Sequence, residues 1–174
     1  MAGRTQPTRC AAMECHTLKN IHCQQRKLMT GIRAANKTVV GWSLAPQMRP
    51  GLVADALRMA WFRRRPAPGL IVHSDRGSQY CSHEFQDLLK QYGMRSSMSR
   101  KGNCWDNAPT ESLWGSLKVA RLHGRRFPTR REAMDEVIDW LSFYNHRRLH
   151  STLGYLSPMQ FERAWLASQQ QRAA

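Results

Sequence analysis

Residues 70–77 read Leu-Ile-Val-His-Ser-Asp-Arg-Gly and give the strongest indication of the fold. The first four form a short apolar run bounded by glycines, which is typical of a buried strand. Asp75 follows, so a carboxylate stands at a strand end, and Glu111 opens a helical stretch further along. Hard cations prefer oxygen ligands held on rigid supports. The two carboxylates therefore indicate Mg²⁺-dependent phosphoryl-transfer chemistry on a nucleic acid.

Strands and helices alternate in the pattern from residue 38 onward. We expect strands at residues 38–44, 70–73 and 94–98, and helices at residues 53–61, 85–92, from 107, 129–146 and from 157. Ser82, Thr129 and Ser157 stand where helix caps are expected. This mixture predicts an α/β sheet covered by helices.

Two of the predicted helices have a clear apolar face. Glu111 and Lys118 are seven positions apart, so they lie about 20° from each other on an ideal helix, opposite Leu113, Leu117 and Ala120. Solvated charges on an ordinary amphipathic helix would give the same pattern. In the later helix, the predicted core stripe consists of Ala133, Val137, Ile138, Leu141 and Tyr144.

The two ends of the chain differ from this central region. Residues 1–37 show no clean period of 2 or 3.6, and we predict an irregular segment there. Residues 38–168 form the predicted core domain, and residues 169–174 a frayed tail.

The charge balance favours a polyanionic partner. The formal net charge is +15, from 27 Lys and Arg against 12 Asp and Glu. Such an excess favours DNA or RNA through phosphate contacts and counterion release. A solvated basic surface is the alternative, and charge alone does not separate an enzyme from a binding protein.

The remaining composition favours a reduced, cytoplasmic chain associated with the nucleoid. Its 41% hydrophobic content suits a folded domain of 174 residues. No apolar run approaches the roughly 18 residues of a membrane span, and no secretory signal is visible at the N-terminus. The five cysteines show no disulfide framework. A zinc site is an alternative whose spacing matches no standard pattern; its residues would be Cys10, Cys15, His16, His22 and Cys23.

Four motifs occur in order along the chain. The first is His-Ser-Asp-Arg-Gly-Ser-Gln-Tyr at 73–80, and the second is the segment 97–108 followed by Glu111. The third is Lys118, seven positions after that glutamate. The fourth is Tyr-Asn-His-Arg-Arg-Leu-His at 144–150, followed by Leu-Gly-Tyr at 153–155 and Ser-Pro at 157–158. With these motifs, residues 39–165 resemble the catalytic core of insertion-sequence transposases related to retroviral integrases, the DDE recombinases. The resemblance implies an RNase H-like core, a five-stranded mixed sheet flanked by helices.

The resemblance also implies the chemistry and the site residues. Three carboxylates of the family hold two Mg²⁺ (or Mn²⁺) ions for DNA strand cleavage and transfer, and Asp75 and Glu111 match two of them. Transposon ends and target DNA are the implied partners, together with further copies of the chain or full-length transposase. The implied DNA-binding residues are Arg100, Lys101, Asn107, Lys118, Arg147, Arg148 and His150. Asn107 and Asp106 suit a cap equally well, and Trp105 and Trp114 are stacking candidates that suit packing better.

The chain departs from the family pattern before residue 38. The family spacing places the first catalytic Asp near position 15, where this chain has Cys15, beside Glu14. A shift of one residue turns a strand side chain to the opposite face. We therefore expect altered or missing first strands, from a shifted reading frame or foreign sequence, and impaired strand transfer. A DNA-binding or oligomerising remnant that interferes with intact transposase is the second interpretation, and a structural RNA binder is the third.

Overall fold

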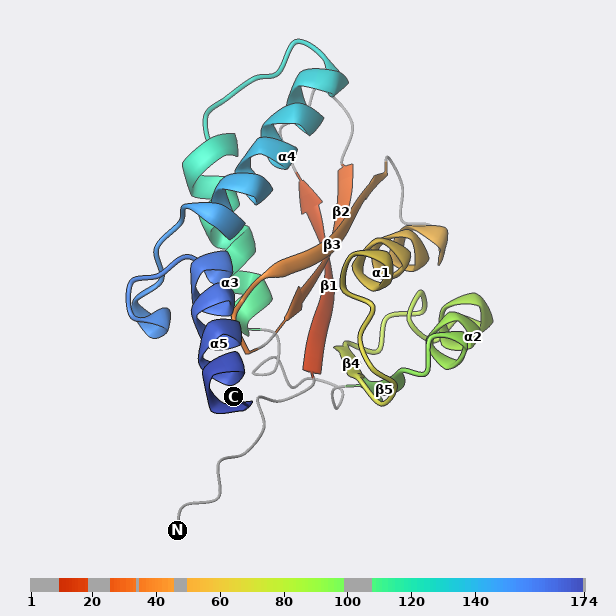
Figure 1. Cartoon of the computed structure of the whole chain (residues 1–174). Coiled ribbons are helices and arrows are strands. Elements are labelled where there is room, and N and C mark those ends of the chain that lie inside the picture. The colour runs from red at the N-terminus through yellow and green to blue at the C-terminus, as the bar shows by residue number, and fades with distance from the viewer. Residues whose placement is uncertain (1–9, 19–25, 34, 46–49, 99–107, 174) are drawn as a thin grey trace.

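The computed structural model describes residues 10–18, 26–33, 35–45, 50–98 and 108–173. Its centre is a five-stranded sheet in the order β3-β2-β1-β4-β5 (Figure 1). The strands are β1 Cys10–Leu18, β2 Arg26–Arg33, β3 Val39–Ala45, β4 Ile71–Ser74 and β5 Arg95–Met98. β1, β2 and β3 pair antiparallel, while β4 runs parallel to both β1 and β5. The sheet is therefore mixed, as predicted.

Helices cover both faces of this sheet (Figure 1). The α-helices are α1 Pro50–Arg64, α2 His83–Gln91, α3 Ala108–Leu117, α4 Arg130–His146 and α5 Pro158–Ala173, with a π-turn η2 at Lys118–Leu122 and a 3₁₀ turn η3 at Ser151–Leu153. Side chains of α1 and α2 form one buried cluster with Met13 and Val72. Those of α3 and α4 form a second cluster with Ile32 and Val39. The sheet separates the two clusters.

The first strands of the sheet are present, contrary to the prediction of an irregular segment before residue 38. β1 and β2 form an antiparallel ladder from Ala11 opposite Arg33 to Leu18 opposite Arg26. Met13 and Ile32 are 2% and 0% exposed and belong to different core clusters. The polar composition of the segment obscured its strand pattern, because tertiary packing overrides local propensity.

The predicted caps are confirmed where three helices begin. The Ser82 hydroxyl accepts from Phe85 N, the Thr129 hydroxyl from Glu132 N, and the Ser157 hydroxyl from Gln160 N. Each satisfies an N–H that has no partner within the helix. Gly93, with φ of 66°, follows α2 as a residue in the left-handed conformation.

Three expectations about the helices were wrong. Ile138 is 37% exposed, and Trp140 is buried in its place, because positions 133, 137, 140, 141 and 144 form the continuous helical stripe. Ala120 is exposed, because the chain changes from α-helix to π-turn at Lys118. Residues 169–173 continue α5 rather than fraying.

Candidate active site

Asp75 stands at the carboxyl end of β4, next to the centre of the sheet. Its Oδ1 accepts a hydrogen bond from Gly77 N at 2.7 Å, and the buried Ser74 hydroxyl donates to the Asp75 carbonyl at 3.1 Å. A Cβ at position 77 would lie 2.4 Å from Gln79 Nε2 and 2.9 Å from this same Oδ1, so a larger residue here would have to displace one or both of these side chains. The tight turn therefore fixes Oδ1 of the half-buried Asp75 side chain, while Oδ2 takes no part in the hydrogen bond to Gly77.

Glu111 lies on the solvent side of α3. The opposite side of this helix buries Leu113, Trp114 and Leu117. α3 packs against β1 and β2, and β4 pairs with β1. Asp75 and Glu111, far apart in the sequence, thus belong to two elements that both adjoin β1.

Lys118 is the first residue of the π-turn that continues α3. It is exposed, as is Glu111. A π-turn widens the helix by one residue, which redirects the side chains that follow, and such turns are frequent at functional sites. The ideal-helix estimate of about 20° between Glu111 and Lys118 therefore applies only up to this turn.

The register of β1 bears on the position of a third carboxylate. The parallel ladder with β4 pairs Cys10 with Ile71 and ends with Met13 opposite Ser74. Continuing it by one residue brings the backbone of Glu14 level with that of Asp75. The strand register thus favours position 14 as the place of the third carboxylate, while the family spacing favours position 15, which is Cys15 in this chain. Within the described residues, no group of three or more His, Cys, Asp or Glu side chains is placed to hold a metal.

The C-terminal motif joins α4 to the segment that follows it. Tyr144 is buried, and its ring meets the ring of His150 edge to face at 5.0 Å. Burial raises the pKa of Tyr144 to about 12, although Arg148 opposes the shift. Burial, with Arg148 and Lys37 nearby, lowers the pKa of His150 to about 4. His150 is therefore neutral near pH 7 and carries no charge toward a phosphate.

The two arginines of this motif have different surroundings. Arg147 is exposed, while the half-buried Arg148 donates from Nη2 to the Ser116 hydroxyl on α3 at 2.9 Å. Arg147 is therefore the better placed of the two to meet a phosphate, and Arg148 ties the motif to α3.

Other predicted site residues are buried or lie outside the described part of the chain. Trp114 is 1% exposed and packs in the core, so it offers no face to a base. Arg100, Lys101, Trp105, Asp106 and Asn107 fall outside the described residues, as do His22 and Cys23 of the zinc alternative.

Sequence reasoning missed one charged cluster. Glu162 on α5 is 7% exposed and pairs with Arg33 on β2 and Arg64 on α1. Glu162 lies 129 positions after Arg33 and 98 positions after Arg64 in the sequence, so no local pattern indicated these contacts.

The sheet order, the helices on both faces and the carboxylate after β4 define an RNase H-like fold of the integrase catalytic core type. The chain superposes on the HTLV-2 integrase catalytic core in complex with magnesium with a TM-score of 0.70 at 15% identity, over 89% of this chain and 96% of that one. For the catalytic core of BIV integrase the TM-score is 0.68, at 15% identity and with coverages of 96% and 99%. At this identity, the likeness establishes the fold.

Sequence comparison gives the family. Integrase core domain models match residues 5–104 and 92–158, and the chain belongs to the integrase core domain family. The first match begins well before residue 38, within the segment that we expected to be unrelated.

The curated relatives of this chain include several insertion-sequence transposases. The chain is 44% identical over 137 residues to the transposase for insertion sequence element IS904 of Lactococcus lactis, covering 78% of this chain and 54% of the relative. It is 47% identical over 133 residues to transposase InsF for insertion sequence IS3A of Escherichia coli, with coverages of 76% and 46%. The chain thus spans about half the length of these relatives.

No helix among the described residues combines the length and apolar character needed to cross a membrane.

Proposed function

We propose that this chain is the catalytic core of an insertion-sequence transposase, which binds the ends of its element at the nucleoid and acts on their phosphodiester bonds. The observation that carries the proposal is the placement of Asp75 and Glu111. One follows β4 and the other lies on α3, and both elements adjoin β1 in an integrase-type fold. The relatives named as transposases support the same reading.

Asp75 and Glu111 are the residues that would hold divalent metal. Both offer carboxylate oxygens, which suit Mg²⁺ or Mn²⁺, and the HTLV-2 core was solved in complex with magnesium. The turn at Gly77 holds Asp75 Oδ1, which fixes the orientation of its carboxylate. When bound, two metal ions activate the attacking oxygen and stabilise the leaving oxygen in phosphoryl transfer. The family set has three carboxylates, and we propose that this set is incomplete here.

Exposed basic residues would bind the DNA backbone. Lys118 follows Glu111 on the same helical stretch, and Arg147 is exposed at the end of α4. Each acts as a positive charge toward a phosphate. Arg100, Lys101 and Asn107 remain predicted DNA contacts. Arg148 and His150 would have a structural role instead of contacting phosphates. Arg148 donates a hydrogen bond to Ser116, and His150 is neutral near pH 7.

The absence of the first catalytic Asp is the reason to propose impaired strand transfer. Extending the ladder between β1 and β4 by one residue beyond Met13 and Ser74 would bring position 14 level with Asp75, and a glutamate is one methylene longer than an aspartate. Catalytic groups must be held within about 0.5 Å of the productive position, so this replacement is expected to slow the reaction.

A catalytically dead chain that binds DNA or joins full-length transposase is the second candidate. The net charge of +15 favours it, because affinity for DNA needs no metal. Such a chain would occupy transposon ends, or pair with intact copies, and so interfere with transposition.

Cleavage and binding assays separate the two candidates. A labelled duplex carrying the element's terminal sequence is incubated with the chain and Mg²⁺ or Mn²⁺, beside Glu111→Gln. We expect salt-sensitive binding by both proteins and only weak cleavage, confined to the unmodified chain. Efficient cleavage lost in Glu111→Gln would disprove the impairment. Absence of any cleavage would favour the remnant, and absence of salt-sensitive binding would contradict both candidates.

The two arginines offer a matched pair for the binding assay. Arg147→Ala should weaken binding and reduce the slope of log affinity against log salt by about 0.9. Arg148→Ala should instead lower stability, because it removes the bond to Ser116. Equal salt slopes for Arg147→Ala and the unmodified chain would exclude Arg147 as a phosphate contact.

A further inference from the structure

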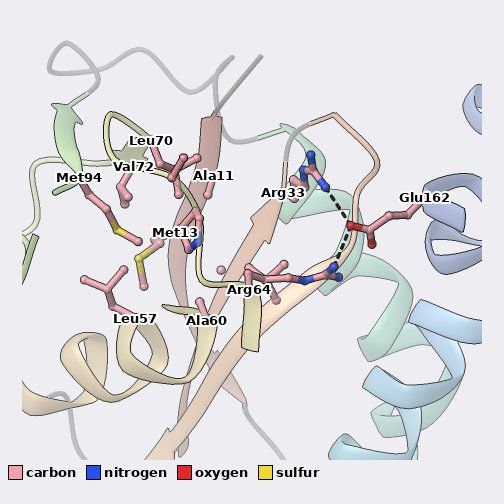
Figure 2. Close-up of a pocket in the computed structure, with 14 residues that line it drawn as sticks. Ala11, Met13, Arg33, Leu57, Ala60, Arg64, Leu70, Val72, Met94 and Glu162 are labelled. Atoms are coloured by element: carbon pink, nitrogen blue, oxygen red, sulfur yellow. Dashed lines mark hydrogen bonds and ion pairs between the residues drawn. The ribbon is translucent and has the colours of Figure 1, made fainter. Parts of the chain in front are cut away.

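A cavity of about 300 Å³ lies between the sheet and α1, and neither Asp75 nor Glu111 lines it (Figure 2). Its walls are mostly apolar, and three small residues leave the space open: Ala11 on β1, Gly31 on β2 and Ala60 on α1. A Cβ built on Gly31 would meet nothing closer than 3.8 Å, so the wall has room at this point.

A charged cluster stands at one side of this cavity. Figure 2 shows Arg33 and Arg64 converging on Glu162, whose Oε1 accepts from Arg33 Nη1 at 2.9 Å and from Arg64 Nη1 at 2.7 Å. All three residues line the cavity. Glu162 is buried, while the two arginine side chains remain 35% and 31% exposed. The polar side of the cavity therefore reaches solvent through the guanidinium groups.

The charges of this cluster do not balance. Two guanidinium groups surround one carboxylate, which leaves one positive charge in excess. Both arginines bond the same Glu162 oxygen through Nη1, and Arg64 Nη2 also donates to Met159 Sδ at 3.8 Å. Each guanidinium has five N–H donors in a planar fork that suits carboxylates. An anionic head group has donors available here, whereas a cationic one would face two positive charges.

We propose that this cavity binds a small amphipathic monocarboxylate, with its apolar chain inside and its carboxylate against Arg33 and Arg64. Since a water molecule occupies about 30 Å³ of liquid, the volume corresponds to about ten non-hydrogen atoms. A straight eight-carbon carboxylate has this size. The walls supply the hydrophobic contact and the guanidinium groups supply the orientation, the usual division of roles in a ligand pocket.

Titration calorimetry on the full chain tests the proposal with sodium octanoate, below the concentration at which it forms micelles. Two probes of equal chain length, octanol and octylammonium, separate head-group recognition from simple filling of the cavity. We expect saturable one-to-one binding of octanoate, at least tenfold tighter than either other probe. Binding of octanol with equal affinity, tighter binding of octylammonium, or no binding of octanoate to the folded chain would overturn the proposal.

Matched variants locate the site. Ala60→Leu fills the cavity and should weaken octanoate binding at least tenfold, while Ala167→Leu, on an exposed position of α5, should leave it unchanged. Circular dichroism and thermal melting establish that each variant is folded. If Ala60→Leu does not fold, Arg64→Gln provides a second test, because it removes a guanidinium and should favour octanol relative to octanoate. Octanoate binding unaltered in a folded variant of either kind would place the ligand elsewhere. DNA binding is measured separately, so failure here leaves the proposed function untouched.

Discussion

Asn145 holds both backbone polar groups of Val39. Its Oδ1 accepts from Val39 N at 2.9 Å, and its Nδ2 donates to the Val39 carbonyl at 2.9 Å. Among the described strands, β3 stands at one edge of the sheet, next to β2. The amide of Asn145 thus takes the place of a further strand at this point. This bond joins the C-terminal motif to the Val-Val-Gly-Trp segment, 106 positions earlier in the chain.

Asn145→Ala should therefore destabilise the fold markedly. It would leave the N–H and the carbonyl of Val39, a residue 2% exposed, without their partner. The expected loss is about 3 kcal/mol in the free energy of unfolding, measured by urea denaturation. Ser142→Ala, on an exposed position of the same helix, should change it by less than about 0.5 kcal/mol. Equal effects of the two variants would contradict this role of Asn145.

Gly41 allows β3 to approach the backbone of α1 closely. A Cβ at this position would lie 2.3 Å from the Ala56 carbonyl oxygen and 2.8 Å from Ala60 N. Because both contacts are to helix backbone, Gly41→Ala must displace α1, and we expect a loss of about 3 kcal/mol in stability. Gly51→Ala is the matched control, since its Cβ would meet nothing within 4 Å in the first turn of α1. It should be neutral or stabilising by up to about 1 kcal/mol. A Gly41→Ala protein as stable as Gly51→Ala would show that α1 is not packed this closely.

The lowered pKa of His150 predicts a pH dependence of stability. Above pH 6.5 the ring is neutral in both the folded and the unfolded chain, so its contribution is complete. Between about pH 6.5 and 4 the unfolded chain takes up a proton that the folded chain does not, and stability falls as the pH falls. Discounted for partial exposure, this loss is about 1–2 kcal/mol.

His150→Phe removes the titrating group and keeps an aromatic ring beside Tyr144. Between pH 7 and 4.5, the unmodified chain should lose about 1–2 kcal/mol more stability than this variant. Equal losses in chemical denaturation at each pH would show that His150 titrates normally in the folded chain.

The sequence predicted the elements after residue 38 because each has a strong local signal. The apolar run before Asp75, the caps Ser82 and Thr129, and the stripe along α4 depend on neighbours within a few positions. Ile138 was misplaced for the same reason, since an apolar residue next to Val137 looks equivalent until the helix is packed.

What sequence reasoning missed depends on distant contacts. β1 and β2 are strands because they pair with each other and with β3 and β4, and their own residues give little sign of it. The Glu162 cluster needs three elements to meet, and the bond of Asn145 to Val39 needs the edge of a sheet. Of the candidate site, Asp75 and Glu111 were predicted from their motifs, whereas position 14 becomes a candidate only when the strand register is extended by one residue beyond Met13 and Ser74.

That register leads to the last prediction, which concerns the first catalytic carboxylate. If Glu14 occupies its place, Glu14→Asp restores the shorter side chain, and we expect Mn²⁺-dependent cleavage of a transposon-end duplex to rise at least tenfold. Cys15→Asp is the matched control, because neighbouring strand positions belong to opposite faces of the sheet, and it should bring no gain. Affinity for Mn²⁺, measured without DNA, should rise in the first variant and remain unchanged in the second. A gain with Cys15→Asp alone would instead support the family spacing and show that β1 is shifted by one residue relative to β4.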